Sequence, residues 1–100
     1  MIKAFAASET QWTAAICAAP WALRAAEVFP GAQVTCYPGL EGEVCRDGHF
    51  IHQPQPLTVV HGRLITSKGP GTAYDFALRI VKELLGEEVR LRVSKDCLLE

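Results

Sequence analysis

Residues 12–20 read Trp-Thr-Ala-Ala-Ile-Cys-Ala-Ala-Pro, an apolar run that leads into a cysteine and a proline. The run at residues 12–16 has the length and composition of a strand that is covered on both faces, as in a parallel sheet. Pro20 suits the first turn of a helix, and a helical pattern continues over residues 21–26. The segment therefore predicts a strand, a sharp turn at Cys17 and a helix.

The flanking segments predict further elements. Residues 2–7 have the spacing of the end of a helix. Residues 32–37 alternate and are rich in β-forming residues, so they predict a second strand, which ends at Tyr37 before a Pro-Gly pair. Residues 40–56 show no sustained period and predict a long surface loop, with one candidate edge strand near residues 50–51.

A hairpin and a helix follow this loop. Residues 57–60 and 63–66 flank His61-Gly62 and predict two strands joined by a two-residue turn. Strands that alternate with helices indicate an α/β layered fold, in which about four strands and three helices are visible.

Residues 72–85 predict the strongest helix. Thr72 and Asp75 form a capping-box pattern, apolar residues recur at the i, i+3, i+4 spacing, and a glycine supplies the stop. Residues 87–91 predict one more helical turn. The tail at residues 93–99 either continues as helix or packs irregularly.

Composition limits the class of protein and of partner. The 100 residues, 49% hydrophobic and 21% charged, suit one small globular domain. A net charge of −1 gives no electrostatic reason to expect nucleic acid or an anionic membrane as a partner. The uncharged, alanine-rich stretch at residues 10–23 is interrupted by Pro20 and cannot span a bilayer. Without an evident secretory signal, we expect a cytoplasmic protein with reduced cysteines.

Cys17 is the first candidate for chemistry. It lies between a strand and a helix, with only two alanines before Pro20, which resembles a nucleophile elbow. A thiol at the start of a helix meets aligned N–H groups that favour its thiolate form. Free cysteines are most often simply buried apolar residues, so position alone leaves both interpretations open.

The other thiols and the histidines give weaker signals. Cys45, His49 and His52 have a Cys-x3-His-x2-His spacing, but no fourth ligand stands at a recognised spacing. We therefore predict no metal site and no cofactor. Cys36 and Cys97 are interpreted as packed or incidental thiols.

Three motifs resemble those of the DJ-1/PfpI family, within the class I glutamine amidotransferase-like superfamily. They are Ala-Ala-Ile-Cys-Ala-Ala-Pro at residues 14–20, Thr-Cys-Tyr-Pro-Gly at 35–39 and Leu-Ile-Thr-Ser-Lys-Gly-Pro-Gly-Thr at 64–72, the last continued at 75–78. The resemblance implies a flavodoxin-like α/β sandwich, usually dimeric, with an easily oxidised elbow cysteine at Cys17. It also implies that residues 1–100 are the C-terminal half of such a domain.

The resemblance assigns roles to individual residues. Ala18 would offer its backbone amide to an oxyanion, and Gly69 and Pro70 would line the pocket. Tyr37 stands where the family often has a histidine, so it either donates a hydrogen bond at the pocket wall or simply packs. The family's glutamate beside the thiolate, and a second oxyanion amide, belong to segments that this chain does not contain.

Several functions follow from the resemblance. In the first, the Cys17 thiolate attacks a small reactive carbonyl such as a 2-oxoaldehyde, as in a glyoxalase or deglycase. In the second, the chain is a redox-sensing or chaperone-like protein without enzymatic activity. In the third, it is an inactive half-domain. A homodimer and a complementing N-terminal half are both candidate assemblies.

Overall fold

The computed structural model describes residues 1–99. Along the chain the helices and strands are α1 (Ile2–Ala7), β1 (Thr13–Ile16), α2 (Pro20–Ala25), β2 (Gln33–Val34), α3 (Glu41–Val44), β3 (Ile51–His52), β4 (Thr58–His61), β5 (Leu64–Ser67), α4 (Ala73–Leu85) and α5 (Glu87–Asp96), with short 3-10 turns η1 (Arg46–Gly48) and η2 (Pro70–Thr72). The expected α/β alternation is therefore present, although with more short elements than the sequence indicated.

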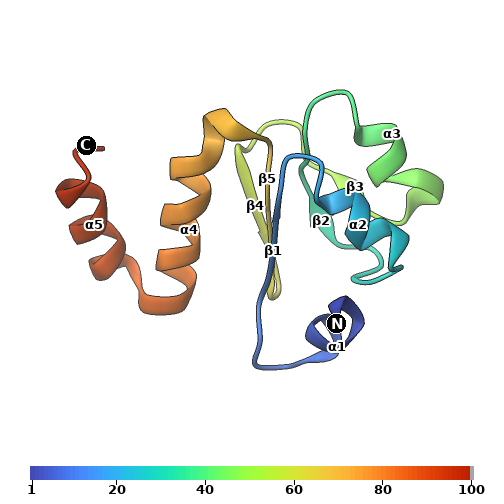
Figure 1. Ribbon diagram of the computed structural model, residues 1–100, viewed down its shortest axis with the longest axis horizontal. Helices are drawn as coiled ribbons and strands as arrows, with labels where there is room; N and C mark the ends of the chain where they lie inside the picture. Colours follow the sequence, from blue (N-terminus) through green and yellow to red (C-terminus); the bar gives the residue numbers. More distant parts are fainter. Residues whose placement is uncertain (100) are drawn as a thin grey trace.

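The central sheet has the order β1-β5-β4. β1 and β5 run parallel, with Ile16 opposite Ser67, and β5 pairs antiparallel with β4 as the predicted hairpin. Figure 1 shows α4 and α5 on one side of this sheet and α1, α2 and α3 on the other. The carboxyl ends of β1 and β5 thus lie side by side, which places Cys17 next to the end of β5.

β2 and β3 form a separate parallel pair that is joined to the sheet by side chains. The backbone N–H of Gln33 donates to Nδ1 of His61 at 3.2 Å, and that of Thr35 donates to Oγ1 of Thr66 at 3.0 Å. Side-chain acceptors thus replace the backbone ladder that would otherwise continue the sheet. This attachment ends the second strand at Val34, three residues before the predicted Tyr37.

The main core lies between the sheet and the elements after β1. All four residues of β5 are buried, and Leu64 packs with a cluster from β1, α2, β2 and α3. The buried members of that cluster are Ala15, Leu23, Val28, Ala32, Val34, Cys36, Val44, Phe50 and Leu64. The core therefore fixes the strand ends from which the candidate site is built.

Three details correct the sequence-based predictions. Residues 41–48 form α3 and η1 where a structureless loop was expected. The hairpin turn is Gly62-Arg63, because His61 is the last residue of β4, and Gly62 adopts φ +60, as a glycine at the first loop position of a two-residue turn can. β1 is covered on one face only, since Ala15 is buried whereas Ala14 is exposed.

The amphipathic helix at α4 is confirmed, but its cap and its burial differ from expectation. No side-chain hydrogen bond caps α4, because the Thr72 hydroxyl is directed to Gly69 and Ser67 instead. α4 contacts β5 and β4, yet none of its residues is fully buried. The last helical segment continues to Asp96 as α5, so the first part of the predicted tail, residues 93–96, is helical.

Candidate functional site at Cys17

The backbone at Cys17 has the shape of an elbow. Cys17 follows β1 directly and adopts φ +65, the left-handed region that costs a non-glycine residue about 1–2 kcal/mol. Its N–H donates to the carbonyl of Ser67 at 3.0 Å, and its carbonyl accepts the N–H of Tyr37 at 2.9 Å. The end of β5 and the segment that follows β2 therefore hold the turn in this strained conformation.

The turn leaves one amide free. The N–H of Ala19 donates to the carbonyl of Ile16 at 3.1 Å, and the Cys17 N–H is occupied by Ser67. Among residues 1–99, no acceptor lies in hydrogen-bond reach of the Ala18 N–H. Ala18 is exposed, so this amide is available to an oxygen atom from outside the turn.

Tyr37 and Gly69 meet beside the elbow. The Tyr37 side chain is 47% exposed. A Cβ atom on Gly69 would lie 3.3 Å from Cδ1 of Tyr37, so only a glycine allows the ring to approach this closely without a shift. The structure thus brings Cys17, Tyr37 and Gly69 together, while Pro70 begins η2 at the exposed end of the same loop.

A cluster of hydroxyl groups, which sequence reasoning missed, supports the loop. Oγ of Ser67, a buried residue, lies 2.9 Å from Oγ1 of Thr58 and 2.6 Å from Oγ1 of Thr72. Oγ1 of Thr72 also donates to the carbonyl of Gly69 at 3.0 Å. Since Ser67 accepts the Cys17 N–H through its carbonyl, the cluster ties the Gly69 loop to the elbow. The sequence signal for this cluster would have been the hydroxyl residues Thr58, Ser67 and Thr72, which lie in or next to the ends of the predicted strands.

The other cysteines differ from Cys17 in their surroundings. Burial, together with Glu41, raises the pKa of the Cys36 thiol to about 11. Burial and Glu41 also raise the pKa of Cys45. Both thiols are therefore protonated at neutral pH. Cys97 is exposed, and Cys17 is partly exposed.

The Cys45, His49 and His52 pattern does not assemble as a ligand set. Nε2 of His49 lies 2.7 Å from the carbonyl oxygen of Val28. In the described part of the chain, no three His, Cys, Asp or Glu side chains gather closely enough to hold a metal ion. Glu41 is also engaged locally, since its carboxylate accepts the Gly39 N–H at 3.0 Å and its pKa is lowered by these backbone hydrogen bonds.

Three surface hollows lie elsewhere. One is between α4 and α5, one is between α2 and α3, and one is lined by Met1, Ile2, Phe5, Trp12 and Thr13. None of these three includes Cys17. Among residues 1–99, no helix has the length and apolar character needed to cross a bilayer.

Comparison with known proteins gives consistent matches. The model of the DJ-1/PfpI family matches residues 1–83. Protein dj-1beta of Drosophila melanogaster is 42% identical over 86 residues, which are 86% of this chain and 45% of the fly protein. Glutathione-independent glyoxalase DJR-1.2 of Caenorhabditis elegans is 40% identical over 74 residues, which are 74% of this chain and 38% of the worm protein.

A solved structure gives the same result. The crystal structure of Drosophila melanogaster DJ-1beta superposes with a TM-score of 0.83 at 35% identity, and the match covers 97% of this chain and 57% of the fly chain. The chain spans less than half the length of the two curated relatives, and its α/β arrangement matches part of the flavodoxin-like fold of the fly structure.

Proposed function

The chain belongs to the DJ-1/PfpI family, and from this premise we propose that Cys17 is the nucleophile of a site that acts on small reactive carbonyls, as in a glyoxalase or deglycase. A relative that is named a glyoxalase is 40% identical, which motivates the substrate class. The strained turn at Cys17 is the observation that most supports the choice of nucleophile. A non-glycine residue at φ +65 between a strand and a helix is typical of an exposed reactive side chain.

The first chemical step uses two groups of the chain. The Cys17 thiolate adds to the aldehyde carbon of a 2-oxoaldehyde, a C–S bond forms, and the electron pair of the C=O bond moves to the oxygen. The free Ala18 N–H donates to this oxyanion. Protonation of the oxygen then gives a hemithioacetal. Tyr37, half-exposed beside Gly69, forms part of the surface that the substrate meets.

The later steps need an acid–base group. A proton must move from the carbon that bears sulfur to the neighbouring carbon, and water must then cleave the resulting thioester to release a 2-hydroxy acid. Glu41 is engaged with the Gly39 N–H and is not suited to this role. We place the acid–base group in a part of the family domain outside these 100 residues.

Consumption of methylglyoxal tests the proposal. We expect the chain to consume methylglyoxal stoichiometrically, as a hemithioacetal at Cys17 that does not turn over without the acid–base group. Cys17→Ser should abolish this uptake, and the matched control Cys97→Ser, at an exposed cysteine, should retain it. Equal rates for Cys17→Ser and the unmodified chain would exclude Cys17 as nucleophile. No consumption by the unmodified chain would instead favour the inactive half-domain.

A redox-sensing role is the second candidate. It is supported by the contrast between Cys17, which is partly exposed, and Cys36 and Cys45, whose pKa values are raised by burial. Mild hydrogen peroxide should add oxygen to Cys17 faster than to Cys97, although Cys97 is the more exposed thiol. Faster oxidation of Cys97 would show that exposure alone controls reactivity and would count against a sensor at Cys17.

A further inference from the structure

The hydroxyl cluster at the end of β5 has fewer protons than contacts. Oγ of Ser67 lies 2.9 Å from the carbonyl oxygen of Leu57 and 2.9 Å from Oγ1 of Thr58. Oγ1 of Thr72 lies 2.6 Å from the same Ser67 oxygen and 3.0 Å from the carbonyl oxygen of Gly69. Each hydroxyl group carries one proton to donate, whereas a carbonyl oxygen only accepts. Three protons therefore serve four contacts.

The shortest contact decides where the protons lie. Two hydroxyl oxygens 2.6 Å apart need a proton between them, because facing lone pairs would repel each other at this distance. If Ser67 donates to Thr72, then Thr72 donates onward to the carbonyl of Gly69. If Thr72 donates to Ser67, then Ser67 donates onward to the carbonyl of Leu57. In both arrangements the proton of Thr58 goes to Ser67, so the Ser67–Thr72 bond is always made.

Both arrangements keep the two carbonyl groups paired. The carbonyl of Leu57 also accepts the Lys68 N–H at 3.2 Å, and that of Gly69 also accepts the Thr72 N–H at 2.9 Å. In addition, the Gly69 N–H donates to Oγ1 of Thr72 at 3.2 Å. The Thr72 hydroxyl thus contacts both backbone groups of Gly69, whereas the hydrogen-bond partner of the Thr58 hydroxyl is Ser67.

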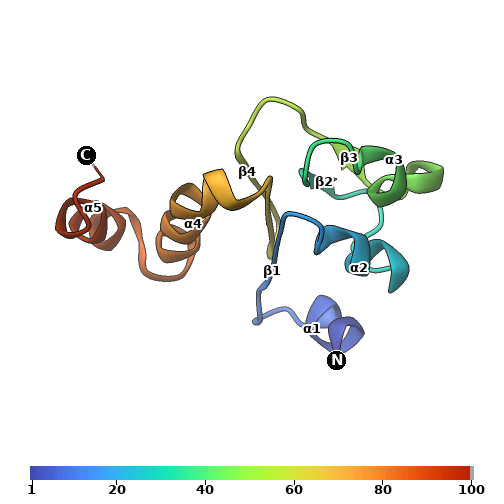
Figure 2. The ribbon, with the colours of Figure 1, turned by 45° about the horizontal axis from the view of Figure 1, so that its top comes forward.

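The Ser67–Thr72 bond lies between the Gly69 loop and the turn at Cys17. Figures 1 and 2 show the turn after β1 and the connection from β5 to α4 at the same end of the sheet. The carbonyl of Ser67 accepts the Cys17 N–H at 3.0 Å, and Gly69 lies against the ring of Tyr37. Ser67 is 0% exposed, so bulk water does not replace a hydroxyl partner that is lost there.

We propose that Ser67 and Thr72 form a positioning pair for the Cys17 site. Their hydroxyl groups hold the Gly69 loop against Tyr37 and keep the Ser67 carbonyl where it accepts the Cys17 N–H. The left-handed turn is strained, so it relaxes when the carbonyl that holds it moves. The inference rests on the proposed role of Cys17 as nucleophile, because the pair acts on the reaction only through the geometry of this turn.

Alkylation by iodoacetamide at neutral pH, followed for each cysteine by peptide mass spectrometry, tests the positioning pair. Thr72→Val should slow the alkylation of Cys17 by at least about fivefold, because the thiol is no longer held in its reactive geometry. Thr72→Ser keeps the hydroxyl group and should restore the rate to within about twofold of that of the unmodified chain. The Tyr37 ring resonances should shift in Thr72→Val only. Cys97, an exposed thiol, should react at the same rate in every variant.

Thr58→Val is the matched control. It removes a hydroxyl group from the same cluster, but in both proton arrangements Ser67 and Thr72 keep their bond to each other and their bond to a carbonyl. The alkylation rate of Cys17 should therefore stay within about twofold of that of the unmodified chain. A purely structural role predicts instead that Thr58→Val and Thr72→Val slow Cys17 equally. That result, an unchanged rate in Thr72→Val, or a slow Thr72→Ser variant would overturn the proposal.

Ser67→Ala is the second variant, and circular dichroism checks that each variant is folded. It removes the other hydroxyl of the pair but keeps the backbone carbonyl that accepts the Cys17 N–H, so it should also slow the alkylation of Cys17. An unchanged rate in Ser67→Ala would overturn the proposal even if Thr72→Val did not fold. Methylglyoxal uptake is measured in parallel. Its absence in the unmodified chain would reject the carbonyl chemistry, whereas the iodoacetamide rates decide on the positioning pair.

Discussion

Two buried threonines should respond in opposite ways to the same substitution. Oγ1 of Thr66 accepts the Thr35 N–H at 3.0 Å, whereas Oγ1 of Thr35 has no partner within residues 1–99, and both residues are 0% exposed. Thr66→Val keeps the shape of the side chain but leaves the Thr35 N–H buried and unpaired, which costs about 1–3 kcal/mol. Thr35→Val removes an unpaired hydroxyl, so stability should stay unchanged or rise by at most about 1 kcal/mol.

Urea unfolding followed by circular dichroism measures both effects. The slope against urea should be similar for the two variants, so the midpoints report the free energies directly. By thermal unfolding, each kcal/mol corresponds to about 4–8 °C for a chain of this size. Equal destabilisation by Thr66→Val and Thr35→Val would refute the reasoning, because it would show that side-chain shape and not the hydrogen bond decides stability at this junction.

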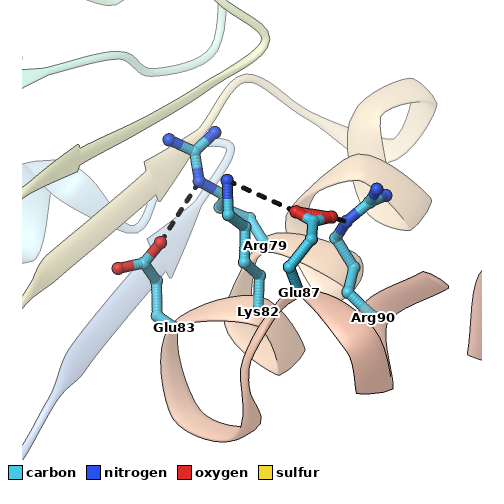
Figure 3. A network of polar contacts seen from close by, with 5 residues as sticks. All are labelled: Arg79, Lys82, Glu83, Glu87 and Arg90. Carbon is cyan, nitrogen blue, oxygen red and sulfur yellow. Dashed lines mark hydrogen bonds and ion pairs between the residues drawn. The ribbon is translucent and has the colours of Figure 1, made fainter.

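Three further predictions concern the loop, the thiols and the last two helices. Gly69→Ala should shift the Tyr37 ring resonances, because a Cβ would lie 3.3 Å from Cδ1, whereas Gly71→Ala, with nothing within 4 Å, should not; identical spectra would contradict the contact. Stability should fall as pH rises from about 9 to 11, because the Cys36 thiol releases its proton near pH 9 in the unfolded chain but holds it to about pH 11 in the folded chain. Cys36→Ala should flatten the stability profile over this pH range. An unchanged slope in that variant would assign the pH dependence to another group. Glu87 pairs with Lys82 and with Arg90, beside the Arg79–Glu83 pair (Figure 3), and its hydrogen bond with Arg90 is the main cause of its lowered pKa. Amide protection of α5 should therefore be present above pH 4.5 and be lost as pH falls below it. Glu87→Gln should speed amide exchange in α5, and an equal effect of Glu88→Gln, at a neighbour without such a pair among the described residues, would argue against these contacts.

Much of the fold could be predicted from local signals. β1, the hairpin of β4 and β5, and α4 were found because apolar period, turn residues and a stopping glycine agree within each segment. The pair of β2 and β3 was harder to find. Each strand is two residues long, and β2 is joined to the sheet by His61 and Thr66, which are distant in the sequence. No local pattern encodes such an attachment.

The candidate site was predicted only in part. Cys17 and Gly69 were identified from the sequence, but the approach of Tyr37 to Gly69 depends on how three chain segments meet. The capping-box pattern at Thr72 was misleading, because its hydroxyl joins Ser67 and Gly69 instead of capping α4. A threonine has several acceptors and donors in reach at a strand-to-helix junction, and tertiary packing selects among them.

The left-handed backbone at Cys17 means that folding and the chemistry proposed for Cys17 favour different residues at the same position. Glycine adopts this conformation without strain, so a library selected for thermal stability alone should drift toward glycine at position 17 and discard the thiol. Screens for thermally stable variants would then enrich proteins that lack the proposed nucleophile. Selection should therefore be made on thiol reactivity and stability together, with position 17 held fixed.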